Sequence, residues 1–178
     1  MQLIFMNPAS RIRQLPSLVL LALLGAGTSV VSAATVTTSF TVSATVLSSC
    51  AVSATNLAFG TYDPNNASDN DATSTVTVTC TLLTPYHVQL NEGQNSVGGS
   101  VTARRMLGPS ASDYLNYALY RDASRTLNWG KTDDTDTVNG TGTGILLPAD
   151  HTVYGRITKN QDVNTGAYSD TITVTVSY

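Results

Sequence analysis

The chain has 178 residues, a formal net charge of −3 and only 12% charged residues. Binding to a nucleic-acid backbone needs clustered lysines and arginines, so this sparsely charged, mildly acidic chain predicts no such partner. Its length, less a cleavable leader, suits a single domain.

Residues 1–33 have the features of a secretory signal peptide. Arg11 and Arg13 precede an apolar run over residues 15–26, and small residues follow it, so we expect cleavage to release a mature chain that begins at Ala34 or one residue later. The apolar run is shorter than the roughly 20 residues that cross a membrane, and no later run approaches that length. We therefore expect an exported protein with no membrane span in its mature chain.

The mature chain opens with a strand pattern at residues 35–47, TVTTSFTVSATVL. Apolar or methyl-bearing side chains recur at every second position, the period of a strand with one buried face: Val36, Thr38, Phe40, Val42, Ala44 and Val46. The segment has neither the charge nor the proline with which proteins usually protect an exposed edge strand. It is therefore expected to pair, either inside its own sheet or with the sheet of another molecule.

Alternation of valine, threonine and tyrosine predicts three further strands, at residues 74–80, 86–90 and 171–178. A helix competes at residues 112–124, but the tyrosines of this stretch favour a strand. Clusters of Asn, Asp and Gly between these runs predict turns, including residues 131–144, and His151 is expected in a turn before a strand. Several short strands in one domain predict an all-β protein with an immunoglobulin-like sandwich.

Cys50 and Cys80 are the two cysteines of the chain. Disulfides form and persist in exported proteins, and two cysteines allow a single intramolecular pairing. A pair of metal thiolates is the competing interpretation, but the sequence lacks the C-x-x-C spacing typical of such sites. We therefore predict a disulfide between Cys50 and Cys80, which stabilises the fold by about 3.5 kcal/mol on the loop-entropy estimate.

The sequence predicts no catalytic, cofactor or metal site. The serines lie in no G-x-S-x-G turn, and no set of acid, base and nucleophile can be assembled from the motifs present. His87 and His151 have no partnering Cys or Glu motif and are expected to be structural or solvent-exposed. The acidic residues at 63–71 and 133–136 lack the order of a calcium-binding loop. The chain is therefore not expected to be an enzyme.

Four stretches of the mature chain form a recognisable series: VLSSCAVSATNLAFGTYDP, the VTVTC that contains Cys80, YALYRDASRTLNWG and GAYSDTITVTVSY. In their order and spacing they resemble the spore coat protein U domain family, which includes subunits of archaic chaperone–usher pili of the Csu type. The resemblance covers essentially the whole mature chain. It implies an immunoglobulin-like sandwich that lacks its final strand and receives it from the N-terminal segment of a neighbouring subunit.

The resemblance also implies roles for particular residues. Residues 35–47 would be the donor strand, and its inward side chains would fill an acceptor groove: Val36, Thr38, Phe40, Val42, Ala44 and Val46. The last strand would line that groove and be the segment that a periplasmic chaperone engages: Ile172, Val174, Val176 and Tyr178. An outer-membrane usher would then catalyse the exchange of chaperone for donor strand. The implied partners are other copies of the chain, the chaperone and the usher.

The expected organisation is a signal peptide at residues 1–33, a donor strand at 34–47 and a pilin domain at 48–178. It implies a structural subunit of a cell-surface pilus that passes through the periplasm and supports adhesion and biofilm formation. A single domain with its own donor strand suits a repeating shaft position, and a minor adaptor near the tip would have the same features. A secreted binding module, or a coat protein of resistant cells that does not polymerise, is the alternative.

Overall fold

The structure, a computed structural model, describes residues 32–178. The predicted signal peptide therefore lies outside the described residues, apart from its last two positions. The chain divides into two units, residues 1–43 and residues 44–178, and each is described by itself.

The described part of the first unit, residues 32–43, has no regular secondary structure, and the same holds for the chain onwards to Ser49. Its apolar side chains are exposed, with Phe40 87% accessible. Within the described residues, the segment at 35–47 pairs with no strand of its own chain.

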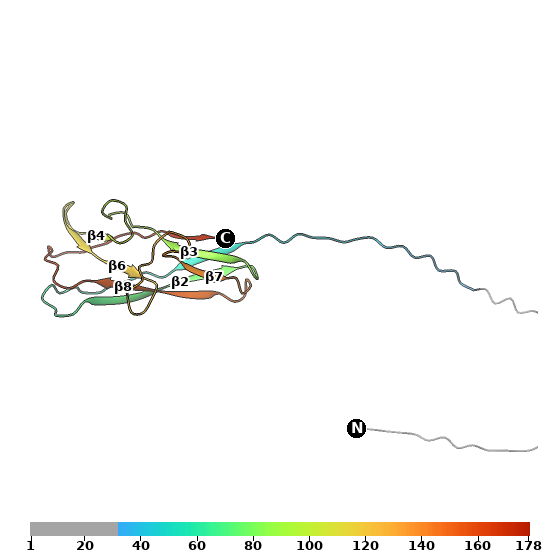
Figure 1. Cartoon of the computed structure of the whole chain (residues 1–178), viewed down its shortest axis with the longest axis horizontal. Helices are drawn as coiled ribbons and strands as arrows, with labels where there is room; N and C mark the ends of the chain where they lie inside the picture. The colour runs from blue at the N-terminus through green and yellow to red at the C-terminus, as the bar shows by residue number, and fades with distance from the viewer. Residues whose placement is uncertain (1–31) are drawn as a thin grey trace, which may run out of the picture. The chain divides into compact units, whose positions relative to one another are not determined.

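Residues 44–178 contain nine strands and no helix. They are β1 (Cys50–Ala54), β2 (Asn70–Cys80), β3 (Pro85–Leu90), β4 (Arg105–Leu107), β5 (Tyr114–Asn116), β6 (Ala118–Tyr120), β7 (Val138–Thr141), β8 (Ala149–Ile157) and β9 (Val174–Ser177) (Figure 1). The strands form three open antiparallel sheets, with the orders β1-β2-β8-β6, β7-β3-β9 and β4-β5. The prediction of an all-β protein is confirmed.

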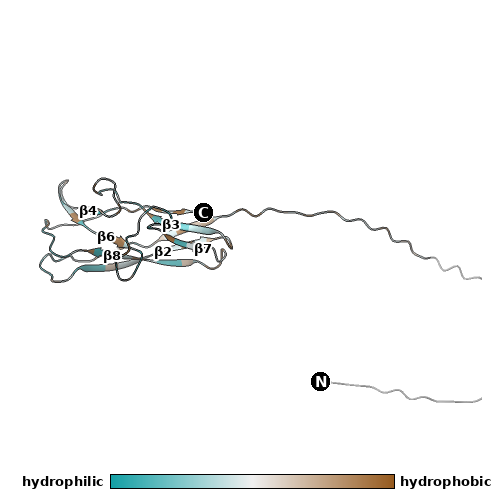
Figure 2. Ribbon diagram, viewed as in Figure 1, coloured by the Kyte–Doolittle hydropathy of each residue, from teal (hydrophilic) through white to brown (hydrophobic). Residues whose placement is uncertain are grey.

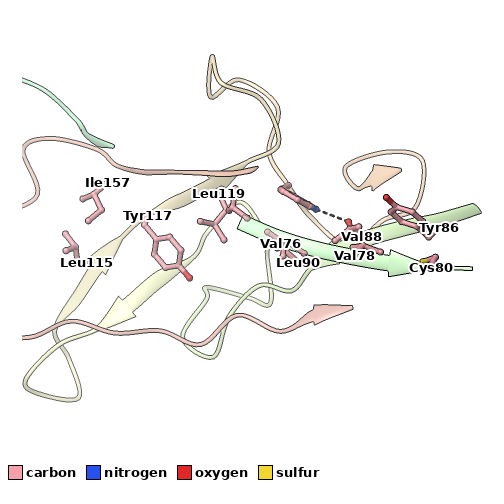
Figure 3. Packing of buried hydrophobic residues seen from close by; sticks show 12 residues of the cluster. Val76, Val78, Cys80, Tyr86, Val88, Leu90, Leu115, Tyr117, Leu119 and Ile157 are labelled. Carbon is pink, nitrogen blue, oxygen red and sulfur yellow. Dashed lines mark hydrogen bonds between the residues drawn. The ribbon is translucent and has the colours of Figure 1, made fainter. Parts of the chain in front are cut away.

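The core lies between the two larger sheets. β2 contributes Val76 and Val78, and β3 contributes Val88 and Leu90, all of them buried (Figure 3). Trp129 is fully buried among them, and its indole Nε1 donates a hydrogen bond to the Val88 carbonyl at 2.8 Å, the dashed line in Figure 3. Hydrophobic and hydrophilic residues both occur along the strands (Figure 2), as expected for sheets that bury one face. The predicted sandwich is thus present.

The strands predicted from alternation are largely present. Residues 74–80 and 86–90 are parts of β2 and β3. The strand predicted at residues 112–124 is divided, because β5 pairs with β4 whereas β6 pairs with β8. Tyr117, between the two, is buried. The last strand is shorter than predicted and begins at Val174.

The predicted turn at residues 131–144 contains a strand, β7. Its third residue is Gly140, and a side chain at this position would overlap the ring of Tyr86 in the neighbouring strand β3. The glycine is therefore required by packing, although in the sequence it reads as part of an Asn- and Gly-rich turn. The prediction of an uninterrupted turn was wrong for this reason.

His151 lies inside β8 and not in a turn before a strand, which corrects the sequence-based placement. The inward face of β8 includes Gly155, where a Cβ would lie 2.8 Å from the side chains of Leu57 and Phe59. Because this inward position has no side chain, the apolar alternation of β8 is interrupted and its full length was not recognised.

The predicted disulfide between Cys50 and Cys80 is present and joins the first residue of β1 to the last residue of β2. Beside it, the Thr81 amide donates to the Ser49 carbonyl at 2.9 Å. Ser177 of β9 pairs with His87 near the start of β3, so the C-terminus lies at this end as well (Figure 1). The first strand therefore starts, and the last strand ends, at the disulfide end of the sandwich.

Candidate functional site: a groove between two edge strands

β1 and β9 are edge strands of different sheets. β1 is paired only with β2, and β9 only with β3. No strand in residues 32–178 pairs with the outer edge of either one. Each edge therefore presents backbone N–H and C=O groups that a strand from another chain is able to bind.

An open groove of about 530 Å³ adjoins these two edges. One wall comes from the end of β1 and the chain after it, namely Ala54, Thr55, Asn56, Leu57 and Phe59. The other comes from the chain before β9 and the first residue of that strand, namely Tyr168, Ser169, Asp170, Thr171, Ile172 and Val174. Core side chains line it between the walls: Val76, Leu90, Leu119 and Val153. The groove therefore reaches the end of β1 and the start of β9 and opens onto the core.

The groove is polar where residues 169–171 precede β9. The carboxylate of Asp170 accepts hydrogen bonds from the Tyr117 hydroxyl at 2.7 Å, the Asn95 side chain at 3.1 Å and the Gln94 amide at 2.9 Å. Burial, with the bond to Asp170, raises the pKa of Tyr117, so the phenol stays protonated and remains the donor. The polar side chains around Asp170 are thus bonded to one another.

Arg104 holds the end of β3 beside the groove. It is buried, and its guanidinium donates to the carbonyls of Leu90, Asn91 and Trp129 at 2.6–3.0 Å. Burial lowers the pKa of Arg104 to about 10, so the group is still charged at neutral pH. The sequence gives no signal for this role, because Arg104 and Arg105 are adjacent and nothing in the pattern indicates which of the two is buried.

The predicted acceptor residues occupy different environments. Ile172 and Val174 line the groove. Val176 is partly buried against the core, and Tyr178 is mostly exposed at the C-terminus. Other groove residues lie outside the strands that the sequence predicted: Leu57, Phe59, Met106 and Tyr168. Phe59 packs edge-on against Tyr117, with ring centroids 6.2 Å apart. The apolar residues of NLAFG were the one feature of the sequence from which a buried position for Phe59 could have been predicted.

The predicted donor residues are all exposed: Val36, Thr38, Phe40, Val42, Ala44 and Val46. Burial of apolar side chains lowers the free energy, so contact of this face with an apolar surface would be favourable. Their role as a donor strand stays a prediction.

Within residues 32–178, no group of three or more His, Cys, Asp or Glu side chains is arranged to hold a metal ion. His87 Nδ1 lies 2.9 Å from Asn139 Oδ1, and His151 Nε2 lies 3.0 Å from the Tyr86 hydroxyl. The partner of His87 lies in the neighbouring strand β7, and the partner of His151 lies in β3 of the other large sheet. The same part of the chain contains no helix with the length and apolar character of a membrane span.

A known protein family matches most of the chain. The family model described as Spore Coat Protein U domain matches residues 36–175. The chain belongs to this family. The match begins within the exposed N-terminal segment and includes the groove, so both are features of one Spore Coat Protein U domain.

Two relatives place this Spore Coat Protein U domain chain among known proteins. It is 38% identical to Protein U of Myxococcus xanthus, over 68% of this chain and 71% of the relative. It is also similar to a chain in a crystal structure described as the CsuC-CsuE chaperone-tip adhesion subunit pre-assembly complex from archaic chaperone-usher Csu pili of Acinetobacter baumannii. That match has a TM-score of 0.54 at 24% identity, and it covers 75% of this chain and 40% of the solved chain.

Family membership confirms the resemblance noted in the sequence. The two chains share a fold over the matched part, which in this chain is an all-β domain with open sheets. Family and fold together show an all-β Spore Coat Protein U domain.

Proposed function

We propose that this protein is a pilus subunit that polymerises by donor-strand complementation. Residues 35–47 of one copy insert into the groove between β1 and β9 of the next copy and complete its sandwich. One observation carries the proposal: the chain combines an open groove that has two free strand edges with an exposed, uncharged segment that has the alternation of a strand.

Donor and acceptor match in chemistry. Main-chain groups of an inserted strand bind the free edge of β9, and every second side chain points into the groove. The lining there includes apolar side chains, among them Val76, Leu90 and Ile172. At roughly 1.5–3 kcal/mol for each buried large side chain, three donor valines and Phe40 contribute on the order of 6–12 kcal/mol before the cost of ordering the segment.

The joint is heterologous, because each copy presents one donor segment and one acceptor groove on different parts of its surface. A contact of this kind adds copies head to tail and extends into a fibre unless the rotation closes a ring. Repeated use of one joint suits the shaft of a pilus, although an adaptor subunit would use the same joint.

Before assembly, the free edge of β9 needs protection, since an exposed strand edge invites unwanted pairing. In the proposed route, a periplasmic chaperone covers the last strand, from Ile172 to Tyr178, and an outer-membrane usher exchanges it for the donor segment. The solved relative, described as a chaperone-tip adhesion subunit complex, supports this route. The finished pilus lies on the cell surface, where it supports adhesion and biofilm formation.

A peptide of residues 35–47, added to a chain that begins at residue 48, tests the proposal. The shortened chain should form no fibres, and the peptide should bind to it and raise its midpoint of thermal unfolding. Phe40→Asp in the peptide places a charge in an apolar groove and should abolish this effect. Thr41→Asp, the matched control, turns the same charge to the opposite face and should retain most of it.

Two outcomes would contradict the proposal. Fibres formed by the shortened chain would show that the segment is dispensable for assembly. Equal stabilisation by the Phe40→Asp and Thr41→Asp peptides would show that Phe40 is not the buried side of the segment.

A coat protein that does not polymerise is the second candidate, and the family description favours it. It predicts that the purified mature chain stays monomeric at every concentration. Donor-strand complementation predicts ladders of oligomers that grow with concentration and resist mild denaturant, so size measurement distinguishes the two functions.

A further inference from the structure

Five large aliphatic side chains are exposed on two loops at the disulfide end of the sandwich. Leu82 and Leu83 lie in the loop between β2 and β3. Ile145, Leu146 and Leu147 lie in the loop between β7 and β8, and Leu146 is 87% exposed. We name these five residues the apolar apex. A group of exposed apolar side chains on an exported domain marks an interaction surface.

The two loops of the apolar apex are held together by backbone hydrogen bonds. The Leu83 amide donates to the Gly142 carbonyl at 2.8 Å, and the Gly142 amide donates to the Thr84 carbonyl at 2.7 Å. The second loop is closed by the Thr143 hydroxyl, which donates to the Leu147 carbonyl at 2.6 Å. The two loops that carry the apex therefore lie side by side.

Leu83 adopts a left-handed backbone with φ of 61°. Glycine or asparagine adopts this conformation at less cost than leucine. The Leu83 side chain is exposed, so packing within the chain does not offset the strain. A strained position that carries an exposed apolar side chain is consistent with a role outside the monomer.

The apolar apex adjoins the point where the donor segment leaves the sandwich. Thr81, next to Leu82, makes two hydrogen bonds with Ser49: its amide donates to the Ser49 carbonyl at 2.9 Å, and the Ser49 amide donates to its hydroxyl at 3.2 Å. Only two residues separate Ser49 from Val46, the last inward position of the donor pattern. Three steps of extended chain span at most about 11 Å, so a copy that binds Val46 lies within that distance of Ser49.

We infer that the apolar apex is a second contact between neighbouring subunits and packs against the copy that has accepted the donor segment. The inference rests on the proposed function. The short tether raises the effective concentration of the two surfaces, so even a small apolar contact forms once the donor strand is bound. Such a contact limits rotation about the joint and stiffens the fibre.

Carbene footprinting of the mature chain, as monomer below the assembly concentration and as fibre, tests this inference. Labelling of the apolar apex should fall several-fold in the fibre. Labelling of Leu127, a half-exposed leucine on another loop, is the internal reference and should not change.

A pair of variants provides the second readout. Leu146→Glu should leave monomer stability unchanged, because the side chain is exposed, and should still permit fibres. Those fibres should bend more easily than wild type in atomic force or electron micrographs. Leu127→Glu, the matched control, should leave fibre stiffness unchanged.

The outcomes separate this inference from the proposed function. Fibres in which the apex is labelled as strongly as in the monomer would overturn the inference and leave donor-strand complementation standing. If Leu146→Glu fibres keep the wild-type stiffness but no longer bind to an apolar surface, the apex is an adhesive surface. This outcome also overturns the inference. A wild-type chain that forms no fibres overturns the proposed function and, with it, the inference.

Discussion

Residues 35–47 and strand β2 have similar sequences and opposite surroundings. Both alternate valine and threonine, yet Val76 of β2 is 1% exposed and Val36 is 96% exposed. β2 is paired on both sides, by β1 and β8, whereas the N-terminal segment pairs with nothing in residues 32–178. Alternation therefore specifies which face of a strand is to be buried, and it does not specify which molecule buries it.

A substitution by aspartate in each of the two regions should give the largest difference in stability between them. Val78→Asp puts an unpaired charge between the sheets, at a cost comparable to the roughly 5–15 kcal/mol stability of a whole domain, so the monomer should not fold. Val42→Asp should leave the thermal unfolding of the monomer unchanged and lower the denaturant resistance of fibres. A large loss of monomer stability in Val42→Asp would mean that the segment is already buried in its own chain.

Replacing Cys50 and Cys80 together by serine should have a smaller effect. The disulfide closes a loop with a sequence separation of 30, and its loss should lower the free energy of unfolding of the monomer by about 3.5 kcal/mol. Urea unfolding of the double variant and of the oxidised wild type measures the difference. An unchanged midpoint would show that strand pairing alone fixes the position of β1 next to residues 35–47.

The smallest expected difference between the two regions is in the pH dependence of stability. Burial lowers the pKa of His151 from its ordinary value of 6.5, and nearby Asp150 partly opposes this. The unfolded chain therefore binds the proton more readily. The stability that neutral His151 contributes is complete above pH 6.5 and is lost as the pH falls through the folded pKa.

His151→Gln should flatten this part of the stability curve in urea unfolding at a series of pH values. Residues 35–47 contain no titratable side chain, so their substitution by Val42→Ala should leave the pH curve of the monomer unchanged. A curve that is as steep in His151→Gln as in wild type would assign the loss of stability to another group.

The parts of the fold that were predicted are those in which local pattern and long-range packing agree. β2 and β3 have apolar side chains at successive inward positions, so their alternation was visible in the sequence. β7 and β8 have glycines at packed positions, Gly140 under Tyr86 and Gly155 under Phe59. Because a glycine adds no apolar side chain to the pattern, the sequence there resembles a turn.

The sequence predicted the part of the candidate groove that the C-terminal residues line, and it did not predict the rest of the groove. Ile172 and Val174 belong to a regular alternation and line the groove. The opposite wall, formed by the end of β1 and the chain after it, is irregular beyond β1, and its position depends on contacts with β8 and Tyr117 that no local pattern encodes. Buried Arg104 was missed because its partners are main-chain carbonyls, which leave no trace in the sequence.

A photo-crosslinking residue at position 40 tests the central claim most directly. Fibres would be assembled from light and heavy-isotope copies, with benzoylphenylalanine in place of Phe40 in the light copies alone. If residues 35–47 occupy the groove of a neighbour, mass spectrometry will find crosslinks from light position 40 to heavy groove residues such as Leu90, Ile172 or Val174. Crosslinks confined to the same copy, or to heavy residues outside the groove, would contradict donor-strand complementation.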